Sequence, residues 1–353
     1  MSEDAANRIA RVQRLIEAAT VLADPEASLG QRAREVLPAE TGLSPENVAL
    51  CLSEVLETHA SESELATLLD AATPCRKAHV LLAANVFTAP LRAIALALAQ
   101  APAVEVRPSR RQPTFTELLL QASPGTFRIV SELSPAPDEH VWAYGRDENL
   151  STVHDELPAG VVFHAHGTGF GAAVVSQALG PDLSATARAI ARDVTPFDQR
   201  GCLSPRIVLA RGDDGFAREL AEALARALAA QAHDVPLGSL SSDEAAEIAR
   251  YRDTLLYAGL VYPAGKGLVG LDLHSNVLLA PIGRNLHIAR VDDPLPPLRE
   301  LAPHLTSVSA PAALHAALRD AVPHARLSEL GEQQRPPLDG PVDLRESAAG
   351  ELL

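Results

Sequence analysis

One stretch of the sequence combines a nucleophile with local features that suit a reactive side chain. It runs from Phe197 to Arg206, reads Phe-Asp-Gln-Arg-Gly-Cys-Leu-Ser-Pro-Arg, and precedes the apolar run Ile207–Ala210. Cys202 follows a glycine, which permits a tight backbone and close approach of a substrate. A cysteine thiolate in such a loop could attack a carbonyl carbon. The alternative is a small apolar residue that fills space, because free cysteine is among the most buried residue types.

Positive charge and a neutral hydrogen-bond donor are the other requirements of this chemistry. Arg200 and Arg206 flank Cys202 in the sequence, and we expect their charge to favour the thiolate. Asn85 follows an apolar run over residues 79–84 that predicts a buried strand. Its amide suits an oxyanion hole for the attacked carbonyl. The alternative interpretation is an ordinary turn-forming asparagine.

Two further segments suggest that a phosphorylated ligand binds. The cluster Arg107, Ser109, Arg110 and Arg111 follows a predicted strand over residues 103–106 and is the densest positive charge in an acidic chain. It suits a phosphate, including a ribose 2′-phosphate, although a solvated basic edge is the alternative. The turn from Gly167 through Thr168 to Gly171 departs in spacing from the dinucleotide fingerprint.

His164 lies in a predicted strand over residues 160–165 and His166 follows it, and if the strand continued the two side chains would point the same way. No acidic or cysteine partner stands at a spacing typical of a metal site, so we predict no metal ligands here. Cys51 and Cys75 lie in or beside a helical region and are interpreted as structural.

The elements that must position these residues follow an alternating pattern. Residues 1–72 predict helices, and short apolar strands then alternate with helices, including a helix over Ala172–Leu179 and a strand over Asn276–Leu279. Such alternation indicates an α/β fold with a doubly wound, mostly parallel sheet. Ligands bind outside the carboxyl ends of such strands, where Asn85, the arginine cluster and the glycine turn fall. We predict a helical segment over 1–72, a dinucleotide-binding domain over 73–196, a catalytic domain over 197–330 and an irregular tail over 331–353.

Composition narrows the class of protein. The chain has 353 residues, nearly half of them apolar, and a formal charge of −15, which argues against nucleic acid or an anionic membrane as partner. Three cysteines without a Cys-x-x-Cys pair suit a reducing compartment. No signal-like segment and no run near the roughly 20 apolar residues of a membrane helix is present. We therefore expect a cytoplasmic protein, and the alanine-rich composition is typical of bacteria.

Several stretches resemble, in order, segments of the aldehyde dehydrogenases. Asn85–Pro90 resembles their Asn-Phe-Pro segment, whose asparagine helps form the oxyanion hole. Val106–Arg110 is similar to their Leu-Lys-Pro-Ser-Glu segment, which binds the cofactor ribose. Val162–Gly171 resembles their Phe-Thr-Gly-Ser-x-x-x-Gly segment near the nicotinamide.

The cysteine block is similar to one branch of that superfamily. Asp198–Arg206 resembles the Asp-Gln-x-x-Cys-x-Ser-Pro-Gln block of LuxC-type fatty acyl-CoA reductases, which make aldehyde for bacterial luciferase. Gly283–Ile288 and Pro337–Gly340 also resemble that branch, and the resemblance covers roughly residues 75 to 345. It implies an aldehyde-dehydrogenase-like fold, with a Rossmann-type parallel cofactor sheet and a second α/β catalytic domain.

The resemblance also implies roles for particular residues. Cys202 would be the nucleophile, and Asn85 with the Cys202 backbone N–H would form the oxyanion hole. The implied cofactor-binding residues are Arg107, Ser109, Arg110, Gly167, Thr168 and Gly171. The arginine charge favours NADPH, with NADH as the alternative. The substrate would be an acyl-CoA or an acyl group on a carrier. A homo-oligomer and an acyl-transferring partner enzyme are further expectations.

The departures from the family pattern bear on the direction of the reaction. Arg107 replaces the family lysine, and no Glu-Leu-Gly-Gly segment lies between Gly171 and Cys202. That segment carries the base for hydrolysis in aldehyde-oxidising members, whereas reduction of a thioester needs no base at that step. The sequence therefore predicts an NAD(P)H-dependent acyl-thioester reductase.

Two other functions stay open at this point. One is oxidation or reduction of a semialdehyde or an acyl phosphate, which the Cys202 and Asn85 pair would also support. The other is a non-catalytic relative that binds a dinucleotide, suggested by the atypical glycine turn and by a chain shorter than LuxC-type enzymes usually are.

Overall fold

The structure is a computed structural model that describes residues 3–345. The chain begins with helices, as predicted: α1 (Glu3–Ala23), α2 (Ser28–Thr41), α3 (Pro45–Leu50), the π-helical turn η1 (Cys51–Val55) and α4 (Glu62–Asp70). Ser44 caps α3 by accepting the Asn47 N–H, and Ser61 and Glu64 form a capping box on α4. Within the described residues no helix has the length and apolar character needed to cross a bilayer.

A first sheet, here sheet A, follows the helical segment. Within residues 3–345 it has five parallel strands in the order β3-β2-β1-β4-β5. They are β1 (Lys77–Leu81), β2 (Ala103–Arg107), β3 (Arg128–Ile129), β4 (His140–Tyr144) and β5 (Val162–His166). The strand order reverses between β1 and β4, and sheets of this kind bind ligands at the carboxyl ends of the strands beside such a point. The predicted Rossmann-type sheet is confirmed.

Helices cover both faces of sheet A. One face packs against α5 (Ala89–Gln100) and α6 (Thr114–Ala122), and α1 lies across these two helices. Leu150 of α7 (Asp147–Glu156) packs on the opposite face against Val141, Ala143 and Phe163. This layering buries alternate side chains of each strand on different faces, so the sheet is rigid behind its carboxyl edge.

The second sheet, sheet B, has seven strands within the described residues, in the order β12-β11-β6-β7-β10-β9-β8. They are β6 (Phe170–Ser176), β7 (Pro205–Arg211), β8 (Leu260–Ala264), β9 (Gly267–Asp272), β10 (Leu286–Val291), β11 (Leu305–Ser309) and β12 (Arg326–Ser328). Only the β8–β9 pair is antiparallel among them. One face packs on α8 (Leu183–Val194) and α9 (Asp214–Asp234), the other on α11 (Leu295–Leu301) and α12 (His315–Ala321). At the β8–β9 end lies α10 (Ser242–Ala258).

The segment predicted as a helix over Ala172–Leu179 is a strand, β6, in the middle of sheet B. All seven residues of β6 are buried, so both of its faces are apolar. A short continuous apolar run has no helical or strand periodicity, which is why the pattern did not separate the two. The strand predicted over Asn276–Leu279 was also wrong, because this stretch contains neither helix nor strand.

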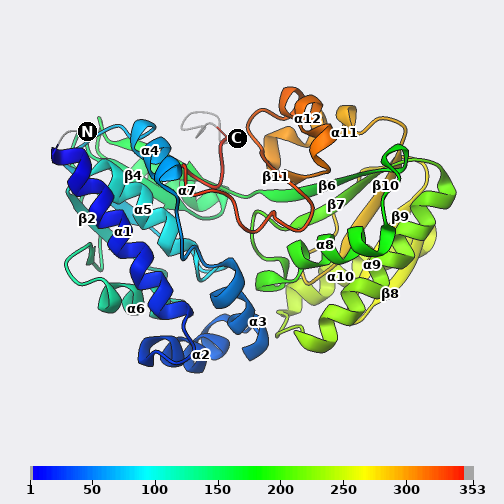
Figure 1. The fold of residues 1–353 in the computed structure, drawn as a ribbon, viewed down its shortest axis with the longest axis horizontal. Helices are drawn as coiled ribbons and strands as arrows, with labels where there is room; N and C mark the ends of the chain where they lie inside the picture. Colours follow the sequence, from blue (N-terminus) through cyan, green and yellow to red (C-terminus); the bar gives the residue numbers. More distant parts are fainter. Residues whose placement is uncertain (1–2, 346–353) are drawn as a thin grey trace.

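The change from one sheet to the other falls at residues 167–169, between β5 and β6. This lies before the predicted domain boundary at residues 196 and 197, because β6 pairs with β7 and β11 and not with sheet A. Figure 1 shows the two halves, with the N-terminal helices and sheet A on the left and sheet B on the right.

The tail is irregular as predicted over its described part, residues 331–345, and it is well packed. Gln333 and Leu338 are buried, and the tail (red in Figure 1) runs between the two halves. Residues 346–353 of the predicted tail lie outside the described residues.

Candidate active site

Cys202 lies in the short loop between η3 (Pro196–Gln199) and β7, at the amino end of sheet B. The connection between β1 and α5 in sheet A packs against this loop. The Phe87 and Phe197 rings meet edge to face with centroids 5.5 Å apart, and a β-carbon on Gly201 would lie 3.5 Å from Cγ2 of Val86. The cysteine therefore sits where the carboxyl edge of sheet A meets sheet B. A junction of this kind is a common place for ligand sites.

Asn85 belongs to the same β1–α5 connection and precedes the two residues that contact the cysteine loop. Asn85 is exposed and Cys202 is partly exposed. The structure thus brings the segments of the two predicted catalytic residues together, although they are more than one hundred positions apart. The role of Asn85 in an oxyanion hole stays a prediction.

The groups that act on the Cys202 thiol come from distant parts of the chain. Burial and the negative charge of Asp343 raise the pKa of Cys202 to about 11, while the charge of Arg345 and the Thr306 hydroxyl act in the opposite direction. Thr306 is fully buried, and its hydroxyl makes no hydrogen bond of normal geometry within residues 3–345, yet it is close enough to favour the thiolate. Cys202 is consequently a neutral thiol near pH 7 in this structure.

Arg345 holds the tail over this site. Its guanidinium binds both oxygens of Asp343, with Nε–Oδ1 2.8 Å and Nη2–Oδ2 2.6 Å, and donates from Nη1 to the carbonyls of Thr168 and Pro303 at 3.1 and 2.8 Å. One side chain thus ties the tail to the link between the sheets and to the turn over residues 302–304 that precedes β11. The two-bond geometry with the carboxylate makes this a strong ion pair.

Arg200 and Arg206 do not supply the charge predicted for them. The Arg200 guanidinium binds Glu244, with Nε–Oε1 3.1 Å, and donates to the Ser239 carbonyl. Arg206 Nε donates to the Ala280 carbonyl. Neither is among the groups with the largest effects on the pKa of the Cys202 thiol. The expectation was wrong because neighbours in sequence can leave a loop in opposite directions, and only packing decides which side chain turns inward.

The predicted cofactor turn is the link between the sheets. A β-carbon on Gly167 would lie 1.9 Å from Oδ1 of Asp147, and that same oxygen accepts the Thr168 N–H at 2.8 Å. A β-carbon on Gly171 would lie 2.3 Å from the Leu203 carbonyl oxygen. Close packing accounts for both glycines, and the Thr168 amide already has an anionic partner. Cofactor binding by these residues stays a prediction.

The arginine cluster lies where the prediction placed it, at the carboxyl end of β2. The Arg107 carbonyl accepts the Leu82 N–H at 3.0 Å, so the end of β2 lies beside the end of β1. Arg107 is partly exposed and Arg110 is exposed, and the Ser109 hydroxyl accepts the Arg111 N–H at 3.3 Å. Charged donors open to solvent at this edge fit the ribose and phosphate portion of a nicotinamide dinucleotide.

His164 and His166 belong to an aromatic row on one face of sheet A. The His164 ring stacks on Trp142 with centroids 4.1 Å apart, and His166 stacks on Tyr144 at 4.8 Å. Burial lowers the pKa of each histidine to about 4, so both rings are neutral near pH 7. Among residues 3–345 no three His, Cys, Asp or Glu side chains gather in a way that could hold a metal ion.

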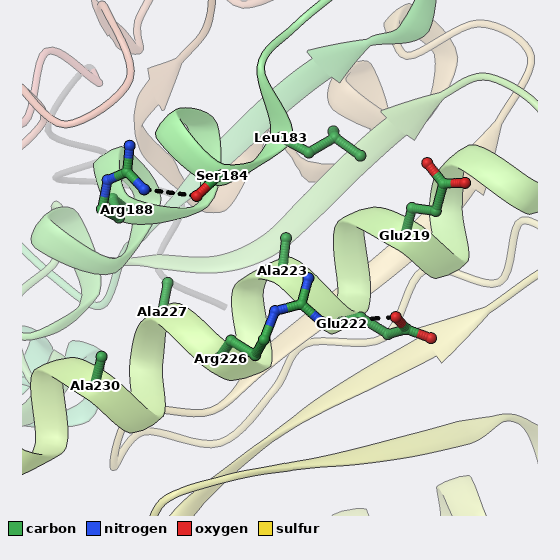
Figure 2. Close-up of a pocket in the computed structure, with 9 residues that line it drawn as sticks. All are labelled: Leu183, Ser184, Arg188, Glu219, Glu222, Ala223, Arg226, Ala227 and Ala230. Atoms are coloured by element: carbon green, nitrogen blue, oxygen red, sulfur yellow. Dashed lines mark hydrogen bonds and ion pairs between the residues drawn. The ribbon is translucent and has the colours of Figure 1, made fainter.

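A separate surface pocket of about 460 Å³ lies between α8 and α9 (Figure 2). Two of its polar side chains are paired within their own helices, Ser184 with Arg188 in α8 at 2.6 Å and Glu222 with Arg226 in α9 at 3.7 Å. No predicted site residue lines this pocket. We therefore place the candidate active site at Cys202.

Sequence reasoning missed three residues that surround the thiol: Thr306, Asp343 and Arg345. The tail was interpreted as irregular because of its proline, glycine and charged residues. One signal was present, because Leu338, in a stretch that resembles the LuxC branch, is an apolar residue that a solvated tail would not need to bury.

Comparisons with known proteins identify the family and the fold. A family model described as acyl-CoA reductase (LuxC) matches residues 127–311, more than half of the chain. No curated protein matches the chain.

Solved structures share the fold at low sequence identity. A NAD-dependent benzaldehyde dehydrogenase from Corynebacterium glutamicum has 14% identity and a TM-score of 0.69, over 97% of this chain and 82% of that one. Lactaldehyde dehydrogenase from Escherichia coli has 13% identity and a TM-score of 0.67, over 92% and 79%. A NADP-dependent glyceraldehyde-3-phosphate dehydrogenase from Bacillus halodurans, complexed with NADP, has 14% identity and a TM-score of 0.61, over 91% and 77%.

Proposed function

This chain belongs to the LuxC acyl-CoA reductase family and is an oxidoreductase that acts on aldehyde-related groups, and from this premise we propose that it reduces an acyl thioester to an aldehyde. The observation that carries the proposal is the placement of Cys202. Cys202, a partly exposed residue, lies in a loop at the junction of the two sheets, and this loop packs against the segment that carries Asn85.

In the proposed reaction the Cys202 sulfur, once ionised, attacks the carbonyl carbon of an acyl-CoA. A bond forms between that sulfur and the acyl carbon, the bond to the coenzyme A sulfur breaks, and coenzyme A leaves as a thiolate that takes up a proton. The Asn85 amide and the Cys202 backbone N–H stabilise the negative oxygen that forms during attack. The acyl group is then held as a thioester on Cys202.

A reduced nicotinamide cofactor, when bound at the carboxyl edge of sheet A, supplies the hydride that converts the acyl group to the aldehyde oxidation level. Arg107, Ser109 and Arg110 would hold its ribose and phosphate, and the charge of the two arginines favours NADPH over NADH. The resulting thiohemiacetal on Cys202 collapses and releases the aldehyde and the free thiol.

The carboxylate that acts on the Cys202 thiol, Asp343, is engaged elsewhere. The Arg345 guanidinium binds both of its oxygens, with Nε–Oδ1 2.8 Å and Nη2–Oδ2 2.6 Å. A base that activates water for thioester hydrolysis must accept a proton, and this ion pair makes Asp343 a poor candidate for that role.

The test offers the protein a series of acyl-CoAs and records its intact mass, then follows NADPH and NADH oxidation. We expect an acyl adduct on Cys202 and turnover that is abolished in Cys202→Ala. The matched control is Cys75→Ala, which removes the other partly exposed thiol and should retain turnover. Full activity in Cys202→Ala, or no adduct with any acyl-CoA, would disprove the proposal.

A semialdehyde or acyl phosphate substrate is the second candidate, because the Cys202 and Asn85 pair serves any carbonyl that forms an acyl-enzyme. Acyl phosphates offered beside acyl-CoAs in the same experiment separate the two. An adduct formed from the acyl phosphate alone would favour the second candidate.

A further inference from the structure

The backbone immediately before the Cys202 loop is strained. Phe197, Asp198 and Gln199 have positive φ angles of 54°, 51° and 68° in succession. Residues with a β-carbon adopt this left-handed region rarely, and then as single residues. Such a conformation persists only where the surroundings hold it in place, and it concentrates at functional sites.

The Asp198 carboxylate is held by three groups from different parts of the chain. Its Oδ1 accepts the Asn47 side-chain amide at 2.9 Å and two nitrogens of Arg284 at 3.0 and 2.7 Å. Its Oδ2 accepts the Gly238 N–H at 3.0 Å. Asp198 is fully buried, so each of these hydrogen bonds is made out of water.

The oxygen and the nitrogen of the Asn47 side-chain amide both form hydrogen bonds with this turn. Its Oδ1 accepts the Phe197 N–H at 3.1 Å, and its Nδ2 donates to the Thr195 carbonyl at 3.1 Å as well as to Asp198. Asn47 is fully buried and comes from α3, in the N-terminal helical segment. Its Oδ1 also accepts from the Cys51 thiol at 3.2 Å.

Gln199 fixes the other end of the turn. Its Nε2 donates to the carbonyls of Pro205 and Asn285 at 2.7 and 2.6 Å, and its Oε1 accepts the Asn285 N–H at 2.9 Å. Gln199 therefore fixes the turn that precedes Cys202 and also the first residue of β7, Pro205, which follows it. The cysteine lies on the short piece of chain between these two anchors.

We propose that Asn47 is a positioning residue for Cys202, which it aims by holding the left-handed turn at residues 197–199. The inference rests on the proposed function and extends it, because it assigns part of the active-site geometry to a helical segment that contributes no group to the chemistry. Asn47 lies outside sheet B and its connections, and its side chain binds the turn from both amide ends. Misplacement of a nucleophile by about 1 Å is enough to slow a reaction severely.

The test compares Asn47→Ala and Asn47→Asp with the wild-type chain. Asn47→Ala removes all the contacts, whereas Asn47→Asp keeps the acceptor and places an oxygen where the donor faced the Asp198 carboxylate. We expect single-turnover acylation of Cys202 by acyl-CoA to slow about tenfold or more in both variants. The acyl-CoA concentration that gives half the maximal rate should stay within about threefold of wild type, because Asn47 does not touch the substrate.

The matched control is Ser123→Ala, which removes another buried polar side chain whose bonds lie within residues 119–126. Thermal unfolding shows which variants are folded. Ser123→Ala should lose stability without slower acylation. Wild-type acylation rates in folded Asn47 variants would overturn the inference. Failure of both variants to fold would overturn it too, because it would assign Asn47 to the fold alone.

A second measurement separates this inference from the proposed function. Alkylation of Cys202 by iodoacetamide, mapped by peptide mass and compared with Cys75 in the same sample, needs no acyl donor. If the wild-type chain forms no acyl adduct, the proposed function fails. A changed ratio of Cys202 to Cys75 alkylation in the Asn47 variants then still supports the positioning role, and an unchanged ratio rejects it.

Discussion

The Asp343 and Arg345 side chains form an ion pair, and their two charges shift the pKa of the Cys202 thiol in opposite directions. Burial and the Asp343 carboxylate raise the pKa of Cys202 to about 11, and the Arg345 charge lowers it. Only the thiolate attacks a carbonyl. The reactivity of this one side chain therefore depends on the Asp343–Arg345 pair, which the tail brings to the loop.

Asp343→Asn should make the thiol more acidic. Removal of a negative charge favours the ionised form, so we expect the pKa of Cys202 to fall by about one unit. At pH 8, below both values, the thiolate fraction and the alkylation rate should then rise about tenfold. The pH dependence of iodoacetamide alkylation measures this. Asp339→Asn is the control, since Asp339 lies in the same tail and pairs with Arg326 at 2.9 Å. An unchanged midpoint in Asp343→Asn would contradict the prediction.

At the scale of elements, the link between β5 and β6 lets the chain pass from one sheet to the other beside the cysteine loop. The Gly171 N–H donates to the Ser204 carbonyl at 2.9 Å, and a β-carbon on Gly171 would lie 2.3 Å from the Leu203 carbonyl oxygen. The start of β6 therefore presses directly on the residues that follow Cys202. No side chain fits there unless the loop moves.

Gly171→Ala should consequently disturb both stability and activity. We expect a loss of about 1–3 kcal/mol in the free energy of unfolding, typical of overpacking, together with slower acylation of Cys202. Denaturant unfolding and intact-mass kinetics measure the two effects. Gly145→Ala is the matched control, because a β-carbon there meets the Leu150 side chain only at 3.8 Å. Equal stability of the two variants would show that the loop yields without cost.

At the scale of the whole molecule, the tail joins the two halves and one buried arginine anchors it. Arg92 of α5 donates to the carbonyls of Pro336, Pro337 and Gly340 at 2.6, 2.8 and 2.8 Å. Its Nε also binds Glu57 at 2.7 Å. The tail continues from Arg92 to Asp343 and Arg345, whose charges act on the Cys202 thiol. The contacts of Arg92 therefore connect the N-terminal helices and α5 to the tail segment of the active site.

Arg92→Ala should weaken the attachment of the tail to α5. It leaves the buried carbonyls and Glu57 without their partner, which should cost roughly 2–4 kcal/mol of unfolding free energy and lower Tm by several degrees. Release of the tail also takes Arg345 away from the thiol, but burial and Asp343 have the larger effects on its pKa, so the alkylation rate of Cys202 should rise. The control is Arg32→Ala, whose pair with Glu35 is exposed and contributes little. A normal Tm in Arg92→Ala would show that the tail is held elsewhere.

Local pattern was sufficient for most of the fold. The capping residues Ser44 and Ser61, the alternation of strands and helices and the cysteine block all lie within short windows of sequence, where periodicity and turn chemistry act. The failure at β6 is of a different kind. A strand that is buried on both faces shows no alternation of apolar and polar residues. Its conformation could therefore be assigned only from its pairing with neighbouring strands such as β7 in sheet B.

The sequence by itself determined that Cys202 is the candidate nucleophile, that Asn85 follows one strand of a parallel sheet and Arg107 ends the next, and that the chain resembles acyl-CoA reductases. Only the tertiary structure decided what surrounds the thiol. Arg200 and Arg206, its neighbours in sequence, bind elsewhere, while Arg345 reaches it from the tail and Asn47 supports its loop from the first helices. The physical reason is that charge and hydrogen bonding act through space over a few ångströms, and packing of the two sheets sets which residues lie that close.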